Sequence, residues 1–380
     1  MIDQDANRAR YIMVGGFLGA GKTTAVDQLA RYLTDRGARV GLITNDQSHG
    51  LVDTSILRGR GFAVEEITGG CFCCRFHSLH EAAEKLTAAS RPEFFVAEPV
   101  GSCTDLVATV CYPLRRIYGD RFTIAPLSVL VDPQRAARIL GIAEGRSFSP
   151  KVVYVYRKQL EEANRIVINK CDTIDEPARR RLESALREAF PRAAIHSCSA
   201  KRGDGLEPWF EDLLASDGPD GAAMSVDYDT YAEGEALLGW LNATVEVAGD
   251  GPFDANELLL RLAARIRELL AAETGDIAHL KMTLDADDAG QLSVVSLVGG
   301  DAEPDLRESL LDRVAGGSLI VNLRAEADPE TLRAATENAL EEIGAAAGLR
   351  LKVEHIEHFR PSRPVPTHRF ASATTEAPPP

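Results

Sequence analysis

The eight residues from Gly16 to Thr23, GFLGAGKT, constrain the fold more than any other part of this sequence. They fit the pattern G-x-x-x-x-G-K-[ST], and they lie between a short apolar run, YIMVGG, and a segment from Thr24 to Asp35 with apolar residues at helical spacing. In that context the pattern predicts a loop whose backbone N–H groups surround phosphate oxygens, because glycines let the chain approach them closely. We therefore expect a nucleotide-binding loop between a first strand and a first helix.

Two side chains of this loop have predicted roles of their own. Lys22 is expected to place a cation on the β and γ phosphates, and the Thr23 hydroxyl is expected to ligate Mg²⁺. The loop residues predicted to bind nucleotide are Gly16, Gly19, Ala20, Gly21, Lys22, Thr23 and Thr24.

Short apolar runs alternate with helical patterns as far as residue 215. This alternation predicts an α/β fold in which a mostly parallel sheet carries helices on both faces. Ligands of such sheets bind at the carboxyl ends of the strands. The expected strands are residues 11–16, 39–45, 93–99, 123–132, 165–172 and 193–200.

A polar break, SDGPDGA, at residues 216–222 suggests a domain boundary. Beyond it the pattern predicts a compact antiparallel sheet with helices on one face, the helices capped by Asp254 and by Asp328 before Pro329. The predicted organisation is a nucleotide-binding domain at 1–215, a linker at 216–226, a smaller α+β domain at 227–370 and a disordered tail at 371–380.

The segment NKCD, Asn169 to Asp172, follows the apolar run RIVI. A carboxylate at Asp172 can accept hydrogen bonds from N1–H and the 2-amino group of guanine, whereas adenine offers an acceptor at N1. This pattern favours GTP and GDP over adenine nucleotides. The residues predicted to surround the base are Asn169, Lys170, Asp172, Ser199, Ala200 and Lys201.

The run EFFVA ends at Glu98, which begins the segment Glu98-Pro99-Val100-Gly101. Most GTPases carry D-x-x-G at this point, where the acid holds Mg²⁺ through water and the glycine N–H contacts the γ phosphate. We therefore assign Glu98 to Mg²⁺ and Gly101 to the nucleotide. No side chain is identifiable as the hydrolytic base.

Three of the seven cysteines lie within four residues, in GGCFCC from Gly69 to Cys74. An odd number of cysteines argues against a disulfide framework, and thiolates this close together can converge on one borderline cation such as Zn²⁺. The alternative interpretation is that these cysteines are small buried residues packed in a turn, with no metal bound. Only three thiols are supplied, which leaves one coordination position open.

Two histidines follow the cysteines, His77 and His80, at the i, i+3 spacing of a helix. They are possible further ligands. However, Ser78 and Glu81 form the pattern of a capping box, which makes the same stretch the first turn of a helix.

The formal net charge of −15 disfavours nucleic acid and anionic membranes as partners, since both reward basic patches. No apolar run approaches the length that crosses a bilayer, and the first residues lack the apolar core of a signal peptide. The expectation is a cytoplasmic protein.

The motifs GGFLGAGKTT, ITND, GGCFCC, EPVG and NKCD follow one another in this order. With them the chain resembles the CobW family, which is related to the nickel-insertion GTPases of urease and hydrogenase. The resemblance implies that Cys71, Cys73 and Cys74 form the C-x-C-C metal motif of that family. It further implies an Mg²⁺-dependent GTPase that uses GTP to load or release Zn²⁺ or Co²⁺ for a client metalloprotein, with a homodimer possible.

Two rival functions use the same motifs. One is a GTPase that activates or assembles a cobalamin-dependent or other metalloenzyme, with a permanent structural zinc at the cysteines. The other is a P-loop kinase for a small substrate, which is disfavoured because kinases do not need N-K-x-D.

Overall fold

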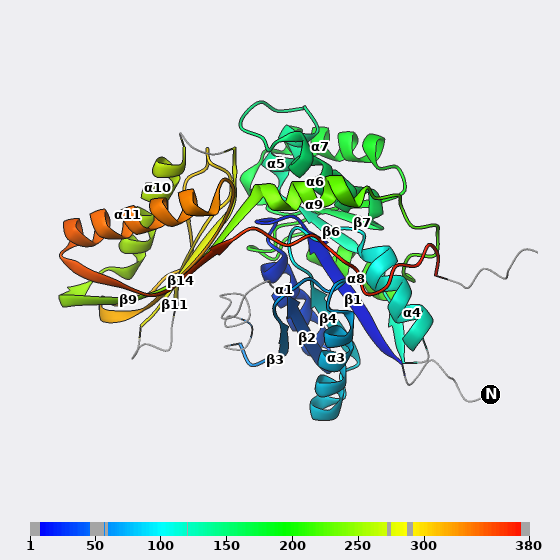
Figure 1. Cartoon of the computed structure of the whole chain (residues 1–380). Coiled ribbons are helices and arrows are strands. Elements are labelled where there is room, and N and C mark those ends of the chain that lie inside the picture. Colours follow the sequence, from blue (N-terminus) through cyan, green and yellow to red (C-terminus); the bar gives the residue numbers. More distant parts are fainter. Residues whose placement is uncertain are drawn as a thin grey trace, which may run out of the picture. The chain divides into compact units, whose positions relative to one another are not determined.

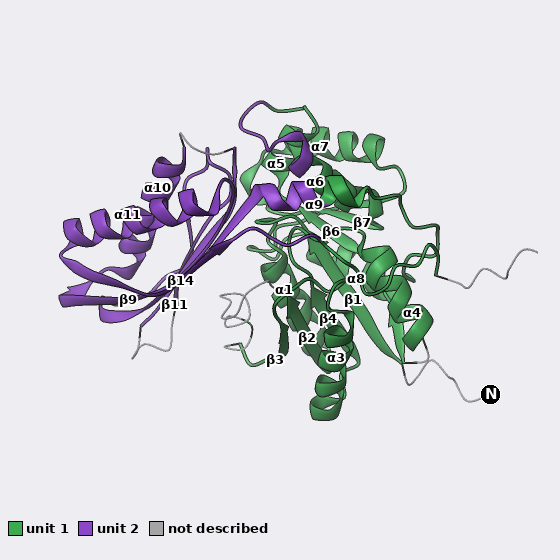
Figure 2. Cartoon of the chain, in the orientation of Figure 1, with its two compact units in different colours: residues 1–143, 153–231, 364–380 green, residues 144–152, 232–363 purple. Residues whose placement is uncertain are grey.

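The computed structural model describes residues 8–45, 57, 60–119, 121–271, 275–286 and 292–373. The chain divides into two compact units, which Figure 2 colours separately. Unit 1 comprises residues 1–143, 153–231 and 364–380, and unit 2 comprises 144–152 and 232–363. These bounds differ from those of the predicted domains, because 216–231 and 364–373 belong to unit 1. The predicted tail beyond residue 373 lies outside the described residues.

Unit 1 contains an eight-stranded sheet in which the registered strand pairs are parallel. Its order is β3-β2-β4-β1-β6-β7-β8, with β5 paired to β1. This confirms the predicted mostly parallel sheet. The bounds are β1 (Ala9–Gly16), β2 (Val40–Asn45), β3 (Ala63–Ile67), β4 (Phe94–Glu98), β5 (Phe122–Ile124), β6 (Ser128–Val131), β7 (Arg165–Ile168) and β8 (Ala194–Ser197).

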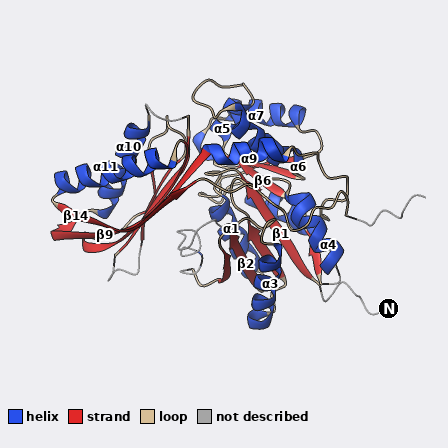
Figure 3. Cartoon of the chain, in the orientation of Figure 1, coloured by secondary structure: helices blue, strands red, loops and turns tan. Residues whose placement is uncertain are grey.

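Helices connect the parallel strands, as Figures 1 and 3 show. The chain moves from β1 to β2 in one direction across the sheet and from β3 to β4 in the other, so right-handed crossovers put α1 and α3 on opposite faces. The bounds are α1 (Lys22–Thr34), α3 (Phe76–Ser90), π-helix η2 (Val107–Cys111), α4 (Tyr112–Tyr118), α5 (Pro133–Ile139), α6 (Pro150–Glu162), 3₁₀-helix η3 (Cys171–Thr173), α7 (Glu176–Ala189), α8 (Leu206–Ala215) and α9 (Tyr228–Leu237).

Unit 2 is a six-stranded antiparallel sheet of order β12-β11-β10-β13-β9-β14. The helices α10 and α11 pack their apolar residues with those of the strands into one core and cover one face of the sheet (Figure 1). Asp254 and Asp328 accept hydrogen bonds from the first N–H groups of these helices, as predicted. The bounds are β9 (Leu238–Phe253), α10 (Ala255–Leu270), β10 (Ile277–Asp285), β11 (Leu292–Leu297), β12 (Asp305–Glu308), β13 (Val314–Glu326), α11 (Pro329–Ala347) and β14 (Leu349–Phe359).

Among the described residues, none of the helices combines the length and the apolar character that a bilayer span requires.

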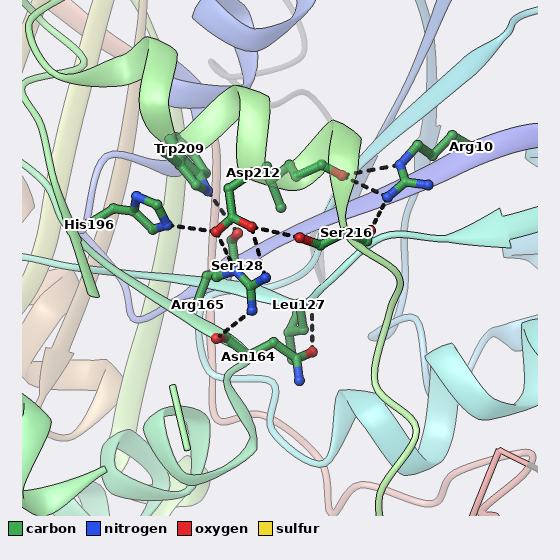
Figure 4. A network of polar contacts seen from close by, with 10 residues as sticks. Arg10, Leu127, Ser128, Asn164, Arg165, His196, Trp209, Asp212 and Ser216 are labelled. Atoms are coloured by element: carbon green, nitrogen blue, oxygen red, sulfur yellow. Dashed lines mark hydrogen bonds and ion pairs between the residues drawn. The ribbon is translucent and has the colours of Figure 1, made fainter. Parts of the chain in front are cut away.

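A polar network joins α8 to strands of the sheet of unit 1 (Figure 4). The Arg165 guanidinium, at the start of β7, donates two hydrogen bonds to Asp212, at 2.5 and 2.9 Å. His196 of β8 lies 2.9 Å from the same carboxylate. The fully buried Trp209 donates from its ring N–H to Ser128 at 2.9 Å. The network therefore joins α8 to three neighbouring strands, β6, β7 and β8.

We expect Asp212→Ala to lower the free energy of unfolding by about 1.5–3 kcal/mol, because charge-assisted hydrogen bonds contribute on that order. Hydrogen bonding from Arg165 holds the pKa of Asp212 below its ordinary value. The stabilisation should therefore be complete above the unfolded pKa of about 3.9 and disappear as the pH falls through the folded value. Urea unfolding at pH 7 measures the loss, with the exposed neighbour Glu211→Ala as control. Equal stability of the two variants would contradict this role.

Candidate functional site

The GFLGAGKT loop joins β1 to α1, and its three glycines, Gly16, Gly19 and Gly21, have backbone conformations that residues with side chains rarely adopt. Gly16 has φ 129° and Gly21 has φ 87°. A Cβ at Gly21 would lie 2.5 Å from Nδ2 of Asn169, and one at Gly16 would collide with the carbonyl of Leu130. Gly21 is also the N-cap of α1 and supplies no capping side chain. The first N–H groups of the helix therefore remain suited to an anion.

Glu98, the last residue of β4, contacts Lys22 and Thr23, the two loop residues predicted to bind phosphate and Mg²⁺. The Thr23 hydroxyl donates to its Oε1 at 3.1 Å, and the Lys22 ammonium lies 3.9 Å from the same oxygen. A hydroxyl and a carboxylate are oxygen donors of the kind that Mg²⁺ prefers. These residues therefore fit the ion and the phosphates assigned to them.

The loop after β4 packs directly against the glycine loop. A Cβ at Gly101 would lie 3.0 Å from the backbone nitrogen of Leu18, so the two loops touch at a point where only glycine fits. The amide of Gln159 donates to the carbonyls of Gly101, at 3.0 Å, and Cys103, at 2.8 Å. The post-β4 loop is thus fixed on both sides.

Asn169, which follows β7, links three of the predicted segments. Its amide donates to the carbonyl of Ala20 at 2.9 Å, and its carbonyl accepts from the backbone N–H of Ala200 at 2.9 Å. Lys170 adopts φ 56° and donates to the carbonyl of Gly19 at 2.7 Å. The segment that should recognise the base is therefore bonded to the loop that should hold the phosphates.

Lys170 also donates to Asp132 at 2.9 Å. Burial alone would raise the pKa of Asp132, but Lys170 and Arg135 outweigh it and hold that pKa below its ordinary value. The Lys170 side chain is thus fixed between a carboxylate and the glycine loop.

The carboxylate of Asp172 lies in η3, where Oδ1 accepts a hydrogen bond from the Ser199 hydroxyl at 2.6 Å. Arg202 lies 3.7 Å from its Oδ2. The two remaining predicted residues, Thr24 and Lys201, are exposed at positions that flank Thr23 and Ala200.

The three cysteine sulfurs form a compact cluster just beyond the carboxyl end of β3. Sγ of Cys71 lies 2.8 Å from Sγ of Cys73 and 3.2 Å from Sγ of Cys74, and the third distance is 3.7 Å. Cys71 and Cys73 are buried, and Cys74 is partly exposed. In the described residues these three form a group that could hold a metal ion.

Asn45, at the end of β2, fixes the cysteine motif from the side of the sheet. Its amide donates to the carbonyls of Ile67, at 3.0 Å, and Gly70, at 2.8 Å, and its carbonyl accepts from the N–H of Phe72 at 3.0 Å. Asp46, the last residue of the motif ITND, lies outside the described residues.

The three thiols differ in acidity because they share hydrogen bonds. Hydrogen bonds with Cys103, Cys73 and Cys74 hold the pKa of Cys71 well below its ordinary value. The bond to Cys71 raises the pKa of Cys73 well above its ordinary value and that of Cys74 to about 11. Cys71 is therefore the preferred thiolate, and a bound cation would replace the protons of the other two.

Cys103 is a fourth thiol beside this cluster, outside the group of three that could hold a metal ion. It is 1% exposed, lies in the post-β4 loop five residues after Glu98, and its thiol hydrogen-bonds to Cys71. The signal in the sequence was its place in the segment EPVGSC, directly after a predicted nucleotide loop.

The two candidate histidines, His77 and His80, lie at the start of α3, which is the alternative that the sequence left open, although the predicted cap is not the one that forms. The helix α3 begins at Phe76 with Arg75 as N-cap, so the predicted capping box at Ser78 and Glu81 is wrong. The reason is that the turn after Cys71 runs directly into the helix, with the N–H of Arg75 bonded to the carbonyl of Cys71 at 2.9 Å. Among the described residues, neither His77 nor His80 belongs to the metal-ligand group.

Residues 10–197 match the family model described as the CobW/HypB/UreG nucleotide-binding domain. This domain belongs to the CobW/HypB/UreG family. Members of the family are P-loop GTPases, which agrees with the predicted resemblance.

Three known proteins show what this chain is similar to. A zinc chaperone CobW from a Sinorhizobium species is 28% identical over 43% of this chain and 51% of its own length. The zinc-regulated GTPase metalloprotein activator 1 of Dictyostelium discoideum is 23% identical over 48% and 44%. The chain thus spans about half the length of these curated relatives. The crystal structure of the hydrogenase maturation factor HypB from Archaeoglobus fulgidus aligns with 55% of this chain and 91% of its own, at 19% identity and a TM-score of 0.40.

Proposed function

We propose that this protein is a cytoplasmic, Mg²⁺-dependent GTPase that loads a transition metal, Zn²⁺ before Co²⁺, into a client protein under the control of GTP. One observation carries the proposal. The loop after β4 takes part in both candidate sites, since Glu98 bonds to Thr23 at its beginning and Cys103 bonds to Cys71 further along.

The nucleotide half of the proposal rests on three contacts. Lys22 and Thr23 would bind phosphate and Mg²⁺ together with Glu98, and Asp172 would bind the base. When bound, Mg²⁺ supplies charge neutralisation at the phosphates. The chain's own contribution is to hold Lys22 and the glycine loop in place through Asn169 and Lys170.

The metal half rests on the chemistry of the cluster. Zinc is the substrate here rather than a resident cofactor, and thiolate sulfurs suit Zn²⁺ better than Mg²⁺ or Ca²⁺. Cys71, Cys73 and Cys74 would supply three ligands. Cys103 lies outside that group of three, and its hydrogen bond to Cys71 makes it our proposed fourth ligand. A ligand from the post-β4 loop would make the number of thiolates around the metal depend on the position of that loop.

The names of the relatives, zinc chaperone and zinc-regulated GTPase metalloprotein activator, support zinc and a client metalloprotein. The second candidate function is an activator of a metalloenzyme or corrinoid enzyme with a permanent zinc. The burial of Cys71 and Cys73 favours it, because buried thiolates exchange metal slowly.

We expect Asp172→Asn to reduce GTP affinity by about 1.5–3 kcal/mol, because it removes a charged acceptor for the guanine N–H groups. ATP affinity should change much less. Fluorescence titration with GTP and ATP measures both, and Asp175→Asn, at the N-cap of α7, is the control. Equal affinity of the wild-type protein for GTP and ATP would contradict guanine recognition.

For zinc, we expect one equivalent to bind the reduced protein through thiolates. Cys73→Ser should abolish tight binding. Cys103→Ser should weaken it by about 10–100-fold and remove one thiolate from the Co²⁺ charge-transfer spectrum, a loss typical of changes around a metal. The buried Cys111→Ser, in η2, is the matched control.

The results of this titration test two claims separately, that the cysteines bind zinc and that Cys103 is the fourth ligand. Absence of tight binding in the wild-type protein would overturn the metal half of the proposed function. Binding that Cys73→Ser abolishes and Cys103→Ser leaves unchanged would remove only the fourth ligand.

A further inference from the structure

Residues 364–373, the last described part of the chain, run over the cysteine motif within unit 1. The backbone N–H of Val365 donates to Sγ of Cys74 at 3.3 Å. The N–H of Thr367 donates to the carbonyl of Cys73 at 2.8 Å, and its hydroxyl donates to the carbonyl of Cys74 at 3.1 Å. Nearly 300 residues of sequence separate the partners, so the contact is tertiary.

The same segment is anchored at its far end. The guanidinium of Arg369 donates to Oδ2 of Asp105 at 2.7 Å, a carboxylate that is 1% exposed. The N–H of Phe370 donates to the carbonyl of Ala108 at 2.9 Å, and the guanidinium of Arg116 lies 4.1 Å from the centre of the Phe370 ring. The anchor therefore lies on the post-β4 loop and the helix that follows it.

The segment is apolar and buried at its two ends, Pro364 and Ala373, and the His368 ring packs edge-on against Phe76, but the rest of it is held by polar contacts. Val365 is 69% exposed, and Thr367 and Arg369 are exposed residues. Its bonds to Cys73 and Cys74 involve backbone groups and one hydroxyl. A segment with few buried apolar contacts opens at a low free-energy cost compared with the sheet beneath it.

The covered face is the one through which the thiol site can exchange metal. Cys71 and Cys73 are 8% and 1% exposed, while Cys74 is partly exposed and is the thiol that the segment contacts. For metal to leave, a ligand from a chelator or a client must approach the metal and displace one of the thiolates. Among the three, only Cys74 offers such a position, and the backbone from Val365 to Thr367 occupies it.

We propose that residues 364–373 form a removable strap over the thiol site, and that metal enters and leaves beside Cys74 when the strap lifts. In the closed state the Val365 N–H supports the Cys74 sulfur, as groups around a metal usually support its ligands. The strap thus slows both loading and release. This inference rests on the metal half of the proposed function.

The test is the rate of zinc exchange in the full-length protein. Thr367→Pro removes the N–H and the hydroxyl that bond to the motif, whereas Thr367→Ser keeps both and is the matched control. Arg369→Ala releases the far anchor. We expect Thr367→Pro and Arg369→Ala to accelerate both zinc loading and zinc release to a chromophoric chelator by about tenfold, the equivalent of losing one or two net hydrogen bonds. Thr367→Ser should exchange at the wild-type rate.

A second readout does not require metal. In the metal-free protein, iodoacetamide should alkylate Cys74 faster in Thr367→Pro than in Thr367→Ser, with Cys103 unchanged. Faster zinc release without faster zinc loading would mean that the strap only stabilises bound metal and does not control its entry. Equal rates in all variants would overturn the proposal that the strap controls metal exchange. If the wild-type protein bound no zinc, the proposed function would fail, and the alkylation rates would still decide whether the strap covers Cys74.

Discussion

The strands of unit 1 run parallel, so their carboxyl ends meet at one edge of the sheet, and the rest of the site depends on this constraint. The glycine loop follows β1, Asn45 ends β2, the cysteine motif follows β3, and Glu98 ends β4. Asn169 then follows β7 and bonds to both the glycine loop and the loop after β8. Groups that are far apart in the sequence are adjacent because each begins where a strand stops.

This arrangement gives a short physical connection between the nucleotide and metal sites. Thr23 bonds to Glu98, and five residues later in the same loop Cys103 bonds to Cys71. Under the proposed function, a change in the post-β4 loop that altered its contact with bound phosphates would also alter the thiol cluster. Linkage requires the effect to be reciprocal, since metal that prefers one position of the loop must favour the nucleotide that stabilises it.

Much of the fold and part of the site could be predicted from local patterns. The glycine loop, the antiparallel second unit and the caps at Asp254 and Asp328 depend on residues that are neighbours in the sequence. β3 was not predicted, because AVEEI carries adjacent glutamates on a strand at the edge of the sheet. The run 123–132 proved to be two strands, β5 and β6. The strap could not be predicted, since its contacts with the cysteine motif form only after folding. Cys103 carried one signal, its place in EPVGSC, but its bond to Cys71 also forms only in the folded chain.

The central claim is that GTP controls the affinity of the thiol site for metal. The most direct measurement is a calorimetric titration of Zn²⁺ into the reduced protein, once with a nonhydrolysable GTP analogue and Mg²⁺ and once with GDP. The account predicts one thiolate-dependent equivalent whose dissociation constant differs between the two states by about 5–150-fold, the usual range of allosteric coupling. A tight equivalent with the same dissociation constant in both states would contradict it and leave a GTPase with a structural zinc.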